Sequence, residues 1–299
     1  MKILLIGYQG YVGSGLFKYL SIDHEVVGWG RKDDILNITN QYILKNNFDI
    51  IINCATVMDR TSENFHPESL TYEVNVRGME SLVKNMKDTG IKFIFISTKD
   101  VYGNTFTKSD IVEKELYYKL PFYVSDSHTF SPKSAYGKSK LIGEYIAEGY
   151  SDYTIIRLSS CYTDYDHYRG HWVPGLIKLL TQGMDVYLTN KGKQVRDLLH
   201  VDDLGLLISK VMFSNKNKLK INAGGGEKNI YSILQFINLI NSNSVKKHNK
   251  GDDFGFVFSN ERAKLEYSWE PLISFKDRIP YIKNNLAKGI TAFTKLVNE

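Results

Sequence analysis

An apolar run near the start of the chain leads directly into three glycines spaced three residues apart. The run Lys2–Ile6 is followed by Gly7, Gly10 and Gly13, and a helical apolar pattern then continues to Leu20. This order predicts a buried strand, a tight turn and the start of a helix. Glycines in such a turn let the backbone approach a pyrophosphate, while the helix N-terminus offers unpaired N–H groups. A glycine-rich turn can also be only a tight loop, but its place after a strand favours a dinucleotide site.

The first half of the chain alternates short apolar runs with longer amphipathic ones. That alternation predicts an α/β fold, a Rossmann-type doubly wound parallel sheet with right-handed crossovers. In such a sheet, ligands bind at the carboxyl ends of the strands. The expected strands are Lys2–Ile6, His24–Trp29, Phe48–Cys54, Lys92–Ser97 and Tyr153–Leu158.

The regular alternation ends at about residue 159. An aromatic-rich loop, a helix near 173–181 and a strand and turn near 185–196 follow, and a further strand is expected at 219–222 with a helix from about Tyr231. We expect residues 1–158 and about 194–222 to form the dinucleotide-binding domain. Residues from about 159 to 193, together with 223–299, should form a smaller, interleaved C-terminal substrate-binding lobe.

Composition excludes several functional classes. The net charge of +5 comes from scattered lysines without a run of like charge, which argues against nucleic-acid binding. Cys54 and Cys161 are too few for a disulfide framework and lack metal-ligand spacing, so no metal site is expected. The apolar stretches are too short to span a membrane, and the N-terminus has no basic leader, which predicts a cytoplasmic protein.

Residues 134–140 place Tyr136 four residues before Lys140, on one face of a helix. An ammonium beside a phenol favours the phenolate and lowers the phenol pKa, so that such a tyrosine can transfer protons near neutral pH. The alternative interpretation is an ordinary exposed helix face, because this spacing also occurs by chance.

The end of the second expected strand carries Gly30 and Arg31, where an NAD-binding protein would place an acidic residue on the adenosine ribose. A guanidinium suits a 2′-phosphate, because it binds phosphate oxygens bidentately. NADP(H) is therefore favoured as cofactor. NAD(H) is the alternative if Arg31 is only a solvated loop residue and Asp33 or Asp34 supplies the carboxylate.

Two further strand ends carry small or hydroxyl residues. Ala55 and Thr56 follow the third strand, where small side chains let the backbone lie close to a flat ligand. The fourth strand ends in Ser97 and Thr98, and a hydroxyl there can hold a substrate carbonyl or alkoxide while Tyr136 handles the proton. Such residues also form ordinary turns.

Four elements together resemble extended short-chain dehydrogenases/reductases that act on nucleotide sugars. The elements are the glycine spacing, the Ser97-Thr98-x-x-Val-Tyr-Gly segment, the Ser-x-Tyr136-x-x-x-Lys140 motif and the segment Gln194-Val-Arg196-Asp197-Leu-Leu-His200-Val-Asp-Asp. Within that family, Leu36–Asn40 and the strand sequence from Phe48 resemble dTDP-4-dehydrorhamnose reductases.

The resemblance implies a role for each matching position. Tyr136 would be the catalytic acid/base, Lys140 would lower its pKa and bind the nicotinamide ribose, and Thr98 would orient the reacting oxygen. Residues implied to contact the cofactor are Gly7, Gly10, Tyr11, Val12, Gly13, Arg31, Asn37, Ile38, Ala55 and Thr56. Residues implied to contact the substrate are Lys99, Asp100, Ser160 and Arg196, of which Arg196 would hold the diphosphate.

Departures from the family pattern limit the reaction type. Sugar 4,6-dehydratases of this family carry Asp-Glu after the Ser-Thr, whereas this chain has Lys99-Asp100, which disfavours elimination because one of the two proton-transfer groups is altered. Ser160 stands where the family pattern has Asn, so substrate contacts there must differ.

The leading hypothesis is NADPH-dependent reduction of the 4-keto group of a nucleotide-linked 4-keto-6-deoxysugar, with Tyr136 as proton donor. The main alternative is a nucleotide-sugar 4-epimerase with tightly bound NAD, which needs the same residues. A 4,6-dehydratase or a non-catalytic regulatory subunit is less favoured. The resemblance also implies a nucleoside diphosphate sugar as substrate and a homodimer.

Overall fold

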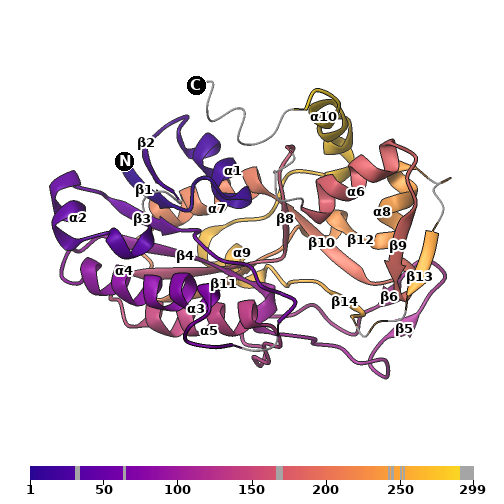
Figure 1. Ribbon diagram of the computed structural model, residues 1–299, viewed down its shortest axis with the longest axis horizontal. Coiled ribbons are helices and arrows are strands. Elements are labelled where there is room, and N and C mark those ends of the chain that lie inside the picture. Colours follow the sequence, from indigo (N-terminus) through magenta and orange to yellow (C-terminus); the bar gives the residue numbers. More distant parts are fainter. Residues whose placement is uncertain are drawn as a thin grey trace.

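The larger lobe of the protein is built on a six-stranded parallel sheet (Figure 1). The computed structural model describes residues 1–30, 34–62, 65–165, 171–241, 243, 246–249, 251 and 253–289. Every neighbouring pair in the sheet is parallel, and the strand order is β11-β7-β4-β3-β1-β2. These strands are β1 (Lys2–Ile6), β2 (Glu25–Trp29), β3 (Ile50–Asn53), β4 (Lys92–Thr98), β7 (Tyr153–Leu158) and β11 (Leu219–Ala223). The expected Rossmann-type sheet is confirmed.

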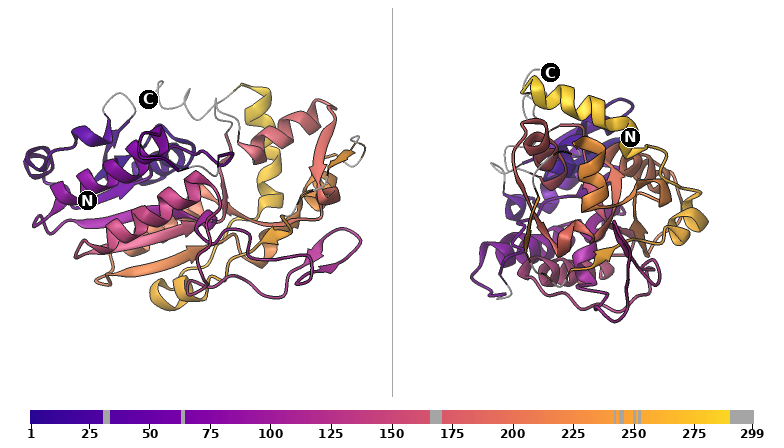
Figure 2. Two further views of the ribbon diagram at one scale, coloured as in Figure 1. Left: turned by 60° about the horizontal axis from the view of Figure 1, so that its bottom comes forward. Right: turned by 90° about the vertical axis from the view of Figure 1, so that its right-hand side faces the viewer.

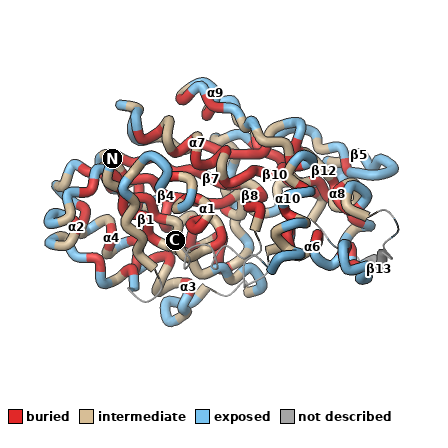
Figure 3. The backbone as a smooth tube through the Cα atoms, turned by 90° about the horizontal axis from the view of Figure 1, so that it is seen from above, coloured by how far each residue is buried: buried red, intermediate tan, exposed pale blue. Residues whose placement is uncertain are grey.

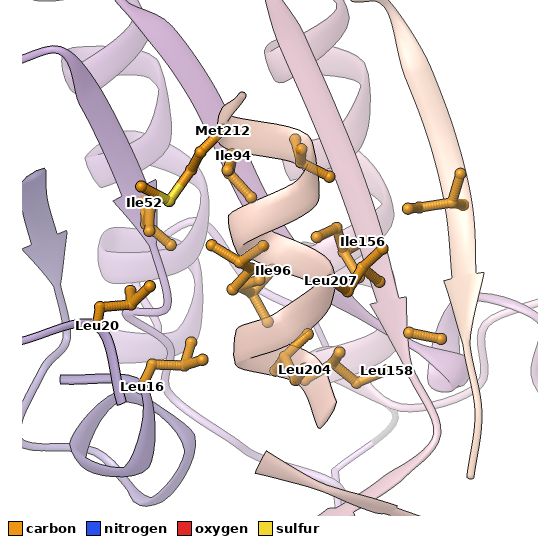
Figure 4. Close-up of a cluster of buried hydrophobic side chains, with 14 of the residues drawn as sticks. Leu16, Leu20, Ile52, Ile94, Ile96, Ile156, Leu158, Leu204, Leu207 and Met212 are labelled. Atoms are coloured by element: carbon orange, nitrogen blue, oxygen red, sulfur yellow. The ribbon is translucent and has the colours of Figure 1, made fainter. Parts of the chain in front are cut away.

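Helices cover both faces of this sheet, because its strands are apolar on both sides. Alternate strand residues enter two separate cores: Leu5 and Ile94 pack with α1 (Tyr11–Leu20) and α7 (Val201–Met212). Leu4 and Phe93 pack on the other side. Figure 4 shows the first core, where leucines of α1 and α7 lie against the strands. The helices of the second face are α2 (Asn40–Asn46), α4 (Gly78–Met86) and α5 (Ala135–Glu148).

The smaller lobe lies beside the carboxyl ends of the large sheet (Figures 1 and 2). Its sheet joins β12 (Ile230–Ser232), β10 (Val195–His200) and β14 (Gly255–Phe256), and β8 (Ser160–Tyr162) also pairs with β10. Three helices pack around a separate core with this sheet: α6 (Trp172–Thr181), α8 (Ile233–Ile240) and α10 (Phe275–Ala287). Shorter elements are α3 (Leu70–Tyr72), α9 (Glu261–Tyr267), and the pairs β5 (Val112–Glu113) with β6 (Tyr118–Lys119) and β9 (Val186–Thr189) with β13 (Lys246–Asn249).

Strand β10 pairs in the smaller sheet, although residues from about 194 were expected in the dinucleotide-binding domain. It pairs with β12 and β14 there, and the chain returns to the large lobe only where α7 begins at Val201. Its neighbouring leucines enter different cores: Leu198 packs in the smaller lobe and Leu199 in the larger. Strand β10 therefore links the two cores. Residues 219–223 do return to the large sheet as expected.

Most strand and helix positions agree with the sequence pattern to within two residues. The helix expected from about Tyr231 begins at Ile233, because Ser232 and Gln235 form a capping box that fixes its start. Figure 3 shows that the large sheet and α7 are mostly buried, whereas α2 and α9 are only partly buried. Within the described part of the chain, no helix combines the length and apolar character needed to cross a membrane.

Candidate active site

The glycine-rich turn packs tightly on the end of β3. Gly7 has φ +81°, and a Cβ atom there would lie 2.6 Å from the backbone nitrogen of Ala55. A Cβ atom on Gly13 would lie 2.2 Å from the carbonyl oxygen of Gly7. Only glycine fits either position without moving the backbone. The turn therefore keeps its backbone accessible at the carboxyl end of β1.

The N-terminus of α1 is suited to an anionic group. Gly10 is its N-cap residue, no side chain caps the helix, and its first turn holds no acidic residue. The N–H groups at the start of a helix and the helix dipole attract phosphate. Gly10, Tyr11, Val12 and Gly13 thus fit the diphosphate of a dinucleotide through their backbone.

The side chain of Tyr11 faces the smaller lobe. Its hydroxyl accepts a hydrogen bond from the backbone N–H of Thr163 at 3.0 Å. Its ring stacks on His171, with the ring centroids 3.6 Å apart. The Tyr11 side chain thus links the glycine-rich turn to the segment before α6, so only the backbone of Tyr11 is left for the expected cofactor contact.

The residues expected near the adenosine lie beyond β2. Arg31 lies outside the described residues. The short helix η2 (Ile35–Asn37) is capped by Asp34, whose carboxylate accepts from the N–H of Leu36 at 3.1 Å. Asn37 is exposed, whereas Ile38 is fully buried in the second core. Ile38 can thus offer a ligand only its backbone.

Asn75 organises the loop after β3 and was not identified from the sequence. Its side chain accepts from the N–H of Val57 at 2.8 Å and donates to Ser139 on α5 at 2.8 Å. The Thr56 hydroxyl also lies 3.3 Å from Asn75. Asn75 belongs to a π-helical segment, η3 (Glu73–Arg77), a conformation frequent at functional sites. The loop carrying Ala55 and Thr56 is thereby held on the helix that carries Tyr136.

Thr98, Tyr136 and Lys140 come together at the carboxyl end of β4. Thr98 lies close enough to Tyr136 for its side chain to lower the pKa of the tyrosine, and its hydroxyl accepts from the backbone N–H of Asp100 at 3.2 Å. Tyr136 and Lys140 lie on α5, whose N-cap Ser134 accepts from the N–H of Gly137 at 3.1 Å. The three are nearly inaccessible to solvent. The expected roles of the three residues stay predictions, and the structure places all three in the buried region between β4 and α5.

The pKa values of the two titratable groups differ from the sequence expectation. Burial raises the pKa of Tyr136, and the charged groups that act on it are Arg60, which lowers it, and Asp100, which raises it. Burial lowers the pKa of Lys140 to about 8, and its amino group lies 4.0 Å from the ring centre of Phe95. The expected lowering of the Tyr136 pKa by Lys140 is therefore not found, because burial dominates and the nearby cation that acts is Arg60.

Arg60 is a second residue of the site that sequence reasoning missed. Its Nε donates to Asp100 at 2.9 Å, and its Cζ lies 5.3 Å from the centre of the Tyr136 ring. Lys99 contacts the other oxygen of Asp100 at 3.1 Å. Burial opposes ionisation of Asp100, but Lys99 and Arg60 together bring its pKa to about 2. The polar run 59–62 soon after the third strand was the available signal.

The other two residues expected to contact the substrate, Ser160 and Arg196, lie on the smaller lobe. Arg196 on β10 forms an ion pair with Asp253, and its side chain is 14% exposed. Burial opposes ionisation of Asp253, but Arg196 and Lys99 together hold its pKa below the ordinary value. A small hollow next to this group is lined by Lys99, Asp253 and Phe256. Ser160 is buried at the start of β8. Asp100, Lys99, Asp253 and Arg196 thus form a series of neighbouring side chains of alternating charge. Ser160 is not part of this series.

A comparison with protein-family models finds a match over most of the chain. The model described as "NAD dependent epimerase/dehydratase family" matches residues 3–224. The chain belongs to this family. Among the described residues, no group of three or more His, Cys, Asp or Glu side chains could hold a metal ion.

Known members of the family match along almost the whole chain. The dTDP-glucose 4,6-dehydratase of Salmonella typhimurium is 22% identical over 338 residues, covering 93% of this chain and 91% of that enzyme. The uncharacterized UDP-glucose epimerase YtcB of Bacillus subtilis is 26% identical over 331 residues, covering 93% and 95%. Among solved structures, UDP-glucuronic acid 4-epimerase from Bacillus cereus, in complex with UDP-glucuronic acid and NAD, has a TM-score of 0.80 at 22% identity, covering 96% of this chain and 99% of that chain.

These comparisons confirm the extended short-chain dehydrogenase/reductase family and the class of nicotinamide-dependent enzymes that modify nucleotide sugars. The named relatives are epimerases and a dehydratase, so they favour the 4-epimerase alternative over the 4-keto reduction expected first. They give no support to a special likeness to dTDP-4-dehydrorhamnose reductases or to a preference for NADP(H).

Proposed function

We propose that the protein is a nucleoside diphosphate sugar 4-epimerase with a retained NAD cofactor. The observation that carries this proposal is the buried group of Thr98, Tyr136 and Lys140 beside an Asp100 that is held ionised. The UDP-glucuronic acid 4-epimerase of Bacillus cereus, solved with NAD and its nucleotide sugar, supports the choice of reaction through its similar fold.

The chemistry assigned to the chain is one reversible proton transfer. A bound nicotinamide supplies a hydride acceptor that can return the hydride. Tyr136 takes the proton from the C4 hydroxyl of the sugar as the C–H bond is oxidised, and gives it back when the ketone is reduced on its other face. Thr98 holds the same sugar oxygen by its hydroxyl, and Lys140 places a positive charge one helical turn from Tyr136.

The elimination catalysed by a dehydratase is disfavoured by the state of Asp100. Loss of water from a sugar needs an acid that protonates the leaving hydroxyl. With a pKa of about 2, Asp100 has no proton to give near neutrality, and both its oxygens are engaged by Lys99 and Arg60. The pair Lys99-Asp100 thus differs from an Asp-Glu pair in chemistry as well as in sequence.

The diphosphate of the substrate is assigned to Arg196. A guanidinium binds phosphate oxygens bidentately, and Arg196 lies on the smaller lobe next to Lys99 and the hollow described above. NAD rather than NADP(H) is proposed because related structures hold NAD. Fluorescence titration with NADH and NADPH tests this choice, and tighter binding of NADPH would restore the interpretation based on Arg31.

The reaction is tested with purified protein and a panel of UDP- and dTDP-linked sugars, with no cofactor added. We expect NAD(H) to be released on denaturation and one sugar to be converted to its C4 epimer, detected by proton NMR. Tyr136→Phe should lower turnover about 100-fold or more. Tyr145→Phe, an exposed position on the same helix, is the matched control and should retain activity.

Other outcomes separate the alternatives. Turnover of a 4-keto sugar that consumes added NADPH, without epimerisation, would instead identify the 4-ketoreductase. Conversion of a 4-hydroxy sugar to a 4-keto-6-deoxysugar would identify a dehydratase. If Tyr136→Phe leaves the biological activity intact, the protein is a non-catalytic partner.

A further inference from the structure

Arg60 lies over the tyrosine of the candidate active site. Its Cζ is 5.3 Å from the centre of the Tyr136 ring. A cation at this distance from an aromatic face is attracted to the ring, and it is attracted more strongly to a phenolate because that species carries a full negative charge. The position of Arg60 therefore favours the phenolate form of Tyr136 over the phenol.

The loop that carries Arg60 is held in place on the catalytic helix. The carboxylate of Asp59 accepts from the backbone N–H groups of Thr61 and Ser62 at 3.1 and 3.0 Å, which closes a tight turn around Arg60. The carbonyl oxygen of Asp59 accepts from the N–H of Tyr136 at 3.0 Å, and that of Ser62 accepts from Ala135 at 2.8 Å. Arg60 is thus attached to the first turn of α5 on both sides.

Asp100 fixes the direction of the guanidinium. Its carboxylate binds the Nε of Arg60 at 2.9 Å and the amino group of Lys99 at 3.1 Å. One carboxylate is therefore shared by two cations, of which Lys99 also faces Asp253 and Arg60 is the one that lies over Tyr136. The charged groups that act on Tyr136 are Arg60 from the loop and Asp100 from η4 (Lys99–Val101), while Lys140 lies one turn further along α5.

We infer that Arg60 is a positioning residue for Tyr136, which holds the phenol ring and favours its phenolate form during proton transfer from the sugar. This role is separate from that of Lys140, which lies one turn further along α5 over the ring of Phe95. The effect of Arg60 on the Tyr136 pKa is downward, in agreement with the geometry. The inference rests on the proposed function only for its kinetic consequence.

The test compares Arg60→Gln and Arg60→Lys with the wild-type protein as purified. Arg77→Gln is the matched control, because Arg77 also lies over a tyrosine, Tyr72, at 5.8 Å and pairs with a carboxylate, and its side chain is 51% exposed against 50% for Arg60. Tyrosine labelled with ¹³C at Cζ reports each phenolate by NMR, and the Tyr136 signal is assigned with Tyr136→Phe.

In Arg60→Gln we expect the ratio of phenolate to phenol at Tyr136 to fall about tenfold at a given alkaline pH. The acid limb of the kcat/KM profile for epimerisation should move to higher pH by about one unit. Arg60→Lys should restore at least half of both changes, and Arg77→Gln should show neither.

The inference is overturned if the Tyr136 signal titrates alike in the wild type and both Arg60 variants, even where their thermal stability falls, because Arg60 would then only fasten the loop. If Arg60→Gln does not fold, Arg60→Met takes its place, because it removes the charge while keeping an unbranched side chain, and it must lower the phenolate ratio in the same way. A Tyr136 shift in protein that shows no epimerisation supports the Arg60–Tyr136 pairing and refutes the proposed reaction.

Discussion

Arg157 and Glu144 form a bidentate ion pair in the interior of the larger lobe. The Nε and Nη2 atoms of Arg157 donate to the two carboxylate oxygens of Glu144 at 2.7–3.1 Å, and the side chains are 0% and 1% exposed. Glu144 also accepts from Ser97 on β4. Since Glu144 lies one turn beyond Lys140 on α5, and Ser97 precedes Thr98, this pair connects α5 with the strand end that carries Thr98.

Glu144→Gln should destabilise the protein strongly. The substitution leaves the buried guanidinium of Arg157 without a counter-charge, a change that typically costs about 3–5 kcal/mol. Urea unfolding should show this loss, and turnover should fall as well if α5 shifts on β4. The control is Glu270→Gln, which breaks an ion pair with Lys264 whose side chains are 61% and 64% exposed and should change stability little. Equal stability of the two variants would show that the interior pair does not hold α5 in place.

Gly13→Ala should impair binding of the dinucleotide. The added methyl group would lie 2.2 Å from the Gly7 carbonyl oxygen, so the turn must open and the N–H groups at the start of α1 must move. We expect NADH affinity to fall about 10-fold or more by fluorescence titration. Gly175→Ala in α6 is the control, because its Cβ atom meets nothing within 4 Å and alanine favours a helix by up to about 1 kcal/mol. Unchanged NADH affinity in Gly13→Ala would place the phosphates elsewhere.

Arg196 and Asp253 should have opposite effects on nucleotide binding. If Arg196 holds the diphosphate, Arg196→Gln should weaken UDP or dTDP binding about 10-fold or more, because a charge-assisted contact is lost. Asp253 pairs with Arg196 and lies near Lys99, so Asp253→Asn should remove a repelling carboxylate and tighten binding. Isothermal titration calorimetry with UDP or dTDP measures the affinity of each variant. Weaker binding in both variants would mean that the pair is a structural contact.

The local parts of this site could be predicted from the sequence, whereas contacts between distant segments could not. The glycine turn and the Tyr136–Lys140 pair each lie within one strand–turn–helix or helix segment, where spacing decides geometry. Arg60 meets Tyr136 only because a loop after β3 folds onto α5, and no periodicity reports that approach. The pairing of β10 in the smaller sheet was not evident from the sequence, because Leu198 and Leu199 enter different cores and an apolar pattern does not distinguish them. The roles of single residues were inferred from the family resemblance. The motifs that carry this resemblance do not decide the cofactor preference or the reaction type, because both depend on contacts outside the motifs.

Asp197 should make stability depend on pH in an unusual direction. The carboxyl group is fully buried beside Gly224, accepts from the N–H of Phe258 at 3.2 Å, and its burial raises its pKa to about 7 from 3.8. A raised carboxyl pKa means that the folded state keeps a proton that the unfolded chain loses above its ordinary pKa. The stabilising contribution is therefore complete below pH 4, falls as pH rises, and is lost above about pH 7.

Asp197→Asn removes this titration while keeping a neutral side chain of similar shape. The free energy of unfolding of the wild type, relative to Asp197→Asn, should therefore fall by on the order of 4 kcal/mol between pH 4 and pH 7, and then level off. Urea unfolding of both proteins across this range measures the difference and cancels the titration of other carboxylates. Parallel curves for the two proteins would show that Asp197 is ionised in the folded state, and that its hydrogen bond from Phe258 is enough to hold a buried charge.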